Sequence, residues 1–286
     1  MAIHFFKDAR YFQLLFQGSF LAYGLIFLHW HAEWMLYATY FVGCVATQWL
    51  CELLVHRKKA GSQECVGYGI AGLPSALITA FGLSLLLKTN DLFIASSITV
   101  IAIASKFVLR RGNKHIFNPS AFGIVTGMLC TDTVWIDTGQ WGNDTVLFFG
   151  VICLGYIVVT RVQQLDLSIA FLSVYACLQF GRQVIFLGWP IDFFVQSITT
   201  GSLLLFSFFM ITDPKTTPNH PWARVCWAMA VAGITFYLST FYFIPGAPVW
   251  VLVATQPLVP LLDRLFNGKT FTWQLPPNAS PLVTGR

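Results

Sequence analysis

Long apolar stretches constrain the fold of this chain more than any other feature of its sequence. They recur along nearly its whole length, and several reach the roughly 20 residues that an α-helix needs to cross the hydrocarbon core of a bilayer. Only 10% of the residues are charged, whereas soluble domains carry about 25%. This composition excludes a soluble protein with a large core, and the sequence predicts an all-α polytopic membrane protein.

We interpret the apolar stretches as ten membrane spans. The connectors between them are short and leave no room for a soluble domain, so residues 1–286 are expected to form a single transmembrane domain. The start of the chain lacks the pattern of a cleavable signal peptide, and the first span is expected to be retained. The spans cover approximately residues 11–28, 33–55, 70–87, 92–109, 117–130, 145–160, 165–187, 193–212, 222–243 and 247–266.

The distribution of basic residues supports ten spans and predicts their orientation. Loops on the cytoplasmic side of membrane proteins are enriched in lysine and arginine. With ten spans, 15 of the 17 basic residues lie at the two termini, in even-numbered loops or at the span ends beside them, and only Lys88 and Arg182 lie in or beside odd-numbered loops. Both termini are therefore predicted to face the cytoplasm. The basic residues are scattered among loops and do not gather on one face, which excludes nucleic acid as a partner.

Ten spans with both ends inside divide into two halves of five, approximately residues 1–140 and 141–286. An odd number of spans in each half makes the halves insert with opposite orientation, which predicts a 5+5 inverted repeat. In such a repeat the third and eighth spans are equivalent, and the spacing from Ser75 to Asp91 equals that from Ser197 to Asp213. Ser75 and Thr79 are thus candidate binding residues, although small polar residues in membrane helices also serve helix packing.

Two polar motifs interrupt the apolar pattern, one at residues 115–119 and one at residues 212–218. Irregular backbone survives at membrane depth only where it is buried in protein or lines a cavity. The fifth span begins at Asn118-Pro119 and is short, which is typical of the broken helices that line binding sites in transporters. Asp213 ends the eighth span, where it serves either a local turn or a binding site. Glu52 and Lys106 lie near span ends, and we expect both to extend toward the membrane surface.

Three blocks of the sequence, residues 105–123, 209–218 and 257–263, resemble the core of the RnfD/NqrB family. They contain Phe-Asn-Pro-Ser-Ala-Phe-Gly, Thr-Asp-Pro with a Thr-Thr-Pro continuation, and Pro-Leu-Val-Pro-Leu-Leu-Asp. The resemblance implies a ten-helix inverted repeat related in fold to urea transporters, placed in a prokaryotic inner membrane. It also implies a subunit of an electron-transport complex that holds flavin and works with other membrane or redox subunits in the lipid bilayer.

The resemblance also implies where a cofactor would lie. In relatives the asparagine that corresponds to Asn118 lies beside a non-covalent flavin, riboflavin or FMN. His115 stands where some relatives have a second asparagine. We expect Asp213 with Thr216 or Thr217 to complete the inner wall of the site. The candidate cofactor-binding residues are Asn118, His115, Asp213, Thr216, Thr217, Ser75 and Thr79, and no catalytic residue is assigned.

The chain departs from the family at the site of covalent flavin attachment. Members with covalent FMN carry a Ser-Gly-Ala-Thr block in the loop after the fifth span, and no such block occurs in this sequence. We therefore predict no covalent FMN, and the loop resembles that of short, stand-alone UnbU-like members. No Cys-x-x-Cys pair is present among the seven cysteines, so no metal or iron–sulfur site is predicted.

Three functions remain open from the sequence. The first is electron transfer through a non-covalent flavin, with quinone as an alternative electron carrier. The second is a solute channel or transporter on the same scaffold, and the third is a structural subunit of a larger membrane complex. Visible absorbance distinguishes the first from the other two, because a flavin is coloured.

Overall fold

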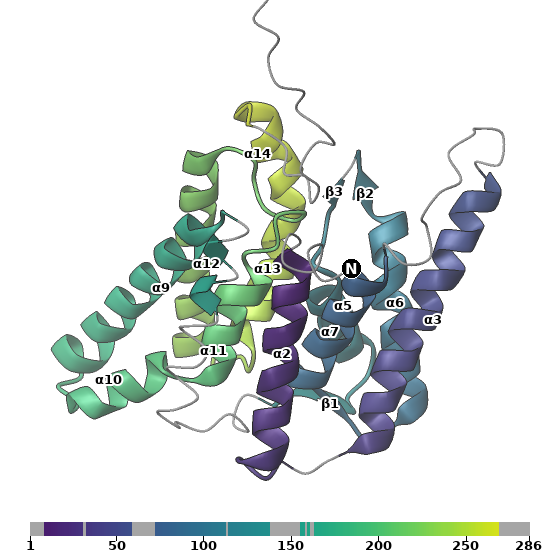
Figure 1. The fold of residues 1–286 in the computed structure, drawn as a ribbon. Helices are drawn as coiled ribbons and strands as arrows, with labels where there is room; N and C mark the ends of the chain where they lie inside the picture. Colours follow the sequence, from purple (N-terminus) through teal and green to yellow (C-terminus); the bar gives the residue numbers. More distant parts are fainter. Residues whose placement is uncertain are drawn as a thin grey trace, which may run out of the picture.

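The computed structural model describes residues 9–30, 33–58, 72–112, 114–137, 155–157, 159–160 and 163–268. Most of these residues are helical, and the helices form two packed groups that meet along one boundary (Figure 1). This arrangement confirms the prediction of a mostly helical, polytopic membrane protein.

Within the described residues of the first half of the chain, the first group contains five helices. Within it, α3 packs against both α5 and α6, α2 packs against α5, and α7 packs against α6 and α5. The helices are α2 (Ala9–Ile26), α3 (Trp34–Lys58), α5 (Leu73–Leu86), α6 (Leu92–Val108) and α7 (Pro119–Cys130).

The second group contains the helices of the second half. Here α12 packs against α9 and α13, and α13 also contacts α7, which joins the two groups. The elements are α9 (Leu165–Phe180), the π-helical turn η2 (Gly181–Phe186), α10 (Ile191–Ile198), α11 (Gly201–Leu205), the π-helical turn η3 (Phe206–Met210), α12 (Pro221–Phe241), α13 (Ala247–Thr255), the 3₁₀ turn η4 (Gln256–Leu258) and α14 (Val259–Leu265).

Among the described residues, three helical segments are long and apolar enough to cross a membrane: Trp34–Val55, Leu165–Phe186 and Pro221–Phe241. A bent pair, Ile191–Ile198 with Gly201–Met210, makes a fourth if it is counted as one span. Every predicted span except the sixth overlaps a described helix, and the sixth, residues 145–160, lies largely outside the described residues. Ten spans and the inverted repeat therefore stay predictions.

We predicted residues 193–212 as one span, but in the structure this span is not a continuous helix. It consists of α10 and α11, which meet at a bend of 45°. At the break Thr199 donates its hydroxyl to the Val195 carbonyl at 2.8 Å, and Thr200 has an extended backbone. Hydroxyl donation to the preceding turn and a following glycine are both common causes of helix bends.

Two short antiparallel ribbons accompany the helices, which the all-α prediction did not include. One pairs β1 (Leu87–Thr89) with β4 (Val134–Ile136), and the other pairs β2 (Arg110–Arg111) with β3 (Lys114–His115). In the second ribbon Gly112 has a φ of 59°, the left-handed conformation that glycine adopts at low cost. This hairpin carries the chain directly from α6 to Asn118.

Close packing of α6 on α7 depends on Gly123 and Gly127, a small-xxx-small pair. A Cβ added at Gly123 would lie 2.8 Å from the Ala102 Cβ, and one at Gly127 would lie 2.6 Å from Ile98 Cδ1. We therefore expect Gly123→Val to destabilise the protein by about 1–3 kcal/mol or more through overpacking. Thermal unfolding in detergent measures this. Gly233→Val in α12 is the control, because nothing lies within 4 Å of its added Cβ, and equal loss in both variants would contradict the explanation.

Candidate functional site

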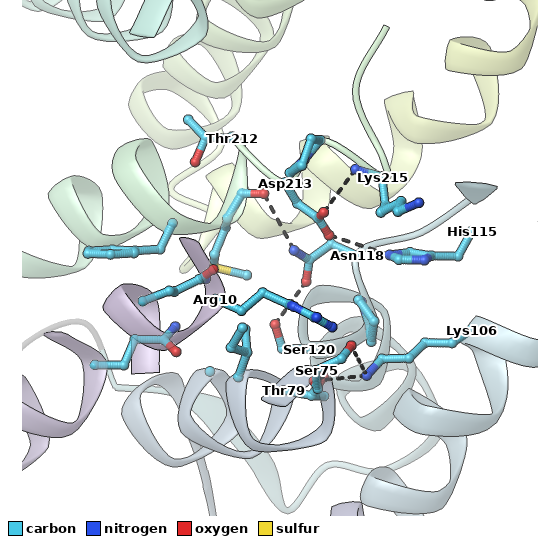
Figure 2. A pocket seen from close by; sticks show the side chains of 18 of the residues that line it. Arg10, Ser75, Thr79, Lys106, His115, Asn118, Ser120, Thr212, Asp213 and Lys215 are labelled. Carbon is cyan, nitrogen blue, oxygen red and sulfur yellow. Dashed lines mark hydrogen bonds and ion pairs between the residues drawn. The ribbon is translucent and has the colours of Figure 1, made fainter. Parts of the chain in front are cut away.

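A cavity of about 310 Å³ lies where α7 begins and η3 ends (Figure 2). Side chains from both packed groups line it, so residues far apart in the sequence meet there. Five of the seven candidate residues are on its wall: Asn118, His115, Asp213, Ser75 and Thr79. Its other polar lining residues include Arg10, Gln17, Gln48, Lys106, Arg110, Ser120 and Lys215.

Asn118 is the N-cap of α7, as the Asn-Pro pair predicts. Its Oδ1 accepts hydrogen bonds from the Ala121 N–H at 3.2 Å and the Ser120 hydroxyl at 2.8 Å. Its Nδ2 donates to the Met210 carbonyl at 3.4 Å, so the side chain joins α7 to η3 across the cavity wall. The amide of Asn118 is thus already engaged by the protein, and its first role is to hold this end of the two groups together.

Asp213 lies in the turn after η3 and faces His115. Its Oδ2 is 3.4 Å from His115 Nε2, and its Oδ1 accepts the Lys215 backbone N–H at 3.0 Å. Burial raises the pKa of Asp213, but the hydrogen bonds from His115 and from the Lys215 N–H outweigh it, and the pKa lies below its usual value. Both interpretations of Asp213 therefore apply, because this ionised side chain forms a local turn and lines the cavity.

Lys106 points into the protein and not toward the membrane surface, so our expectation for this residue was wrong. Its Nζ donates to the Ser75 carbonyl at 3.0 Å and to the Ser75 hydroxyl at 3.1 Å (Figure 2). Thr79 donates its hydroxyl to the same carbonyl at 3.0 Å. These contacts hold the ammonium group on the cavity wall, where its charge is available to a ligand.

Thr216 and Thr217 do not line the cavity. Both are buried in the turn behind Asp213, where the Thr216 hydroxyl donates to the Asp213 carbonyl at 3.2 Å. The Thr217 carbonyl accepts a 2.6 Å hydrogen bond from Lys114 Nζ. These contacts stabilise the turn that presents Asp213, so the expectation that either threonine completes the inner wall is not supported by the geometry.

Two glutamines on the cavity wall were missed by sequence reasoning. Gln17 in α2 is 3% exposed and Gln48 in α3 is 8% exposed. Among the described residues no donor contacts the Oε1 atom of either side chain. A buried acceptor without a partner is costly, and polar residues inside membrane helices are a common sign of function. Their isolated positions in apolar helices were the available signal.

The cavity carries a positive potential. Arg10, Lys106, Arg110 and Lys215 line it together with a single acid, Asp213. Burial lowers the pKa of Lys215, the charge of Asp213 opposes this, and repulsion from Arg110, Lys114 and Arg10 adds to the lowering, so the pKa lies below its usual value. Such surroundings favour an anionic or carbonyl-rich ligand.

The described residues contain no group of three or more histidine, cysteine, aspartate or glutamate side chains that could hold a metal ion. The loop after the fifth predicted span begins at Thr131 and is described only to Asp137. Thr138 and the residues after it lie outside the described part, so the prediction of no covalent FMN rests on the sequence alone.

Comparison with known proteins identifies the family of the chain. The profile of the NQR2, RnfD, RnfE family matches residues 129–272, half of the chain. Two curated relatives, one from Stutzerimonas stutzeri and one from Halorhodospira halophila, are each named as a subunit of an ion-translocating oxidoreductase complex. Each is 30% identical over 74 residues, which cover 26% of this chain and 21% of the relative. The aligned stretch thus spans about a fifth of each relative, but the profile match is sufficient to show that the chain belongs to the NQR2, RnfD, RnfE family.

Proposed function

We propose that this protein is a membrane electron-transfer subunit that holds a non-covalent flavin in the cavity beside Asn118. Its named relatives are subunits of ion-translocating oxidoreductase complexes, and we propose that this chain likewise works with other membrane or redox subunits.

The unpartnered Gln17 and Gln48 oxygens carry the proposal, because they are buried acceptors on a cavity wall that is otherwise rich in donors. An isoalloxazine ring offers one N–H donor and two carbonyl oxygens, which match the glutamine acceptors and the lysine and arginine donors. Phe107, Phe208 and Phe209 are among the apolar residues of the lining. The volume, about 310 Å³, is at the lower end of the roughly 300–1,000 Å³ typical of small-molecule sites.

A bound flavin supplies reversible electron transfer. The contributions of the chain are binding, orientation and electrostatics. Gln17 or Gln48 would accept the ring N–H, and Lys106 would donate to a carbonyl or phosphate oxygen. The charges of Lys106 and its basic neighbours stabilise negative charge in the cavity, which favours a reduced cofactor. The His115–Asp213 pair holds the rim of the site, and the buried aromatic side chains exclude water.

The absorbance spectrum of the purified, unheated protein tests the proposal. We expect the visible bands of oxidised flavin, and we expect denaturation to release the colour into the supernatant because the cofactor is not covalently attached. Flavin fluorescence that stays with the chain in a denaturing gel, at Thr131, Thr133 or Thr138, would contradict the non-covalent assignment. A colourless protein that is fully folded would refute flavin binding and leave a channel or a structural subunit.

The proposed orientation places both termini in the cytoplasm, on the basis of the 15-to-2 distribution of basic residues. In a background without native cysteines, Thr133→Cys should react with an impermeant thiol reagent added outside intact cells. Arg111→Cys should react only after the membrane is opened. Both positions are exposed in the structure, so burial within the protein would not explain a failure to react. Labelling of position 111 from outside would contradict this orientation and indicate the opposite one.

We also propose that the two packed groups are the two halves of an inverted repeat. Residues 9–130 provide the first group and residues 165–265 the second. The bent α10–α11 pair takes the place of α5 in the second half. The shared Ser-to-Asp spacing in these two segments supports this equivalence.

A further inference from the structure

A second pocket, of about 200 Å³, lies between the β2–β3 hairpin and α14. It shares His115 and Lys215 with the rim of the first cavity but is otherwise formed by different residues. Its polar lining is mostly basic, with Arg111, Lys114 and Arg264 around a single acid, Asp263. The electron-transfer proposal makes no use of this pocket.

Contacts within the protein neutralise the acid of the pocket. Lys114 Nζ contacts Asp263 Oδ2 at 2.9 Å, and it also donates to the Thr217 carbonyl and to Asn219 Oδ1. The other Asp263 oxygen accepts the Asn219 N–H at 2.7 Å. Lys114 and Asp263 therefore form a closed structural pair that holds α14 against the hairpin, with no net charge.

Besides Lys215, the pocket has two arginines, whose charges no acid of the described residues neutralises. Both are exposed, and neither forms an ion pair within the described part of the chain. Arg111 makes only a long contact, 3.5 Å, from Nη1 to the Pro260 carbonyl. Two guanidinium groups at one pocket are suited to a phosphate group, which they can bind through paired hydrogen bonds.

An apolar surface lies next to this basic pocket on the same helical segment. Leu258, Leu261 and Leu265 are 52%, 51% and 67% exposed. Their spacing of three and four residues places them along one side of the helix, next to Arg264, which follows Leu261 by three residues, whereas Asp263 lies on the opposite side. A phosphate site beside an exposed apolar stripe fits an amphiphile better than a soluble anion.

We propose that Arg111 and Arg264 bind the phosphate of an anionic phospholipid whose acyl chains lie along Leu258, Leu261 and Leu265. The last turn of the terminal membrane helix is where a lipid headgroup would be met. This lipid would anchor the hairpin that carries His115 to α14. The inference does not depend on a flavin in the neighbouring cavity.

Native mass spectrometry of the full chain in detergent, titrated with defined lipids, tests the proposal. We expect phosphatidylglycerol to bind more tightly than phosphatidylcholine of the same acyl composition, and inorganic phosphate and FMN not to displace it. One basic residue near a membrane surface is worth about 1 kcal/mol, so Arg264→Gln should weaken phosphatidylglycerol binding about fivefold and Arg111→Gln with Arg264→Gln roughly 25-fold.

Arg182→Gln is the matched control, because it removes the same charge in η2, just after α9, where the guanidinium lies over the Phe241 ring. It should leave lipid affinity unchanged. If the wild-type protein binds both lipids equally, this result alone would overturn the proposal. So would displacement by phosphate or FMN, or full affinity in folded Arg264→Gln protein. Mass spectrometry detects the bound lipid directly. A colourless protein that still prefers phosphatidylglycerol would therefore refute the proposed flavin binding but support the lipid site.

Discussion

Lys106→Met is expected to lower flavin retention roughly ten- to a hundredfold. A hydrogen bond from a charged donor contributes about 1.5–3 kcal/mol, and each 1.4 kcal/mol corresponds to about a tenfold change in affinity. The variant should still fold, because the Ser75 carbonyl keeps the hydroxyl of Thr79 as a donor. Methionine fills a similar volume and removes a buried charge, which by itself does not destabilise a core.

Flavin content per folded protein, measured by absorbance after release, is the readout for Lys106→Met. Lys88→Met is the matched control, because Lys88 is the other buried lysine of the described residues. Lys88 lies in β1, which follows the last residue of α5, whereas Lys106 contacts Ser75 in the first turn of α5. Its Nζ contacts Glu33 at 3.8 Å and the Tyr37 hydroxyl at 3.4 Å, and none of these three residues is among the lining residues of the cavity. That variant should retain full flavin. If the Lys106→Met protein folds and its flavin content is unchanged, Lys106 does not contribute to flavin binding.

Gln17→Leu should separate a ligand contact from a structural one. Removing a buried acceptor without a partner spares the folded chain a cost of about 1–3 kcal/mol, so the flavin-free protein should be as stable as the wild type or more stable. Removal of the same acceptor from a bound ring N–H should weaken flavin binding by a similar energy, roughly five- to a hundredfold. Stability and affinity are thus expected to change in opposite directions.

Thermal unfolding of flavin-free protein and flavin titration measure the two effects of Gln17→Leu. Gln179→Leu in α9 is the control: Gln179 is also buried, but its amide donates to Tyr175 and its carbonyl accepts from Gln183. This control should lose stability and keep its flavin affinity. If Gln17→Leu behaves like Gln179→Leu, Gln17 has an internal partner in solution and carries no ligand contact.

Asn118 is a poorer test of the cofactor site than the sequence indicated. Asn118→Leu would remove the cap of α7, and loss of such a cap costs about 0.5–2 kcal/mol. It would also leave the Ser120 hydroxyl and the Met210 carbonyl without their partners. Lower flavin content in that variant would therefore report the shape of the cavity as well as direct contact.

The sequence alone determined the class of the protein, the approximate position of most described helices and the two interruptions. Apolar length decides membrane insertion, and Asn-Pro or Asp-Pro decides where a helix can begin or end, because capping and proline geometry act within a few residues. For that reason the start of α7 at Pro119 and the turn at Asp213 agree with prediction. The family resemblance could likewise be read from short blocks of sequence.

Only the tertiary structure decided which polar side chains share a cavity. The direction of a side chain depends on the rotation of its helix against its neighbours, and packing sets this rotation at positions such as Gly82, where an added Cβ would lie 2.8 Å from the Ser120 hydroxyl. Thus Lys106 points inward to Ser75, Gln17 and Gln48 join the wall, and Thr216 and Thr217 lie behind it. Local sequence determines helices because their hydrogen bonds are local, whereas convergence on a site depends on contacts between helices distant in sequence.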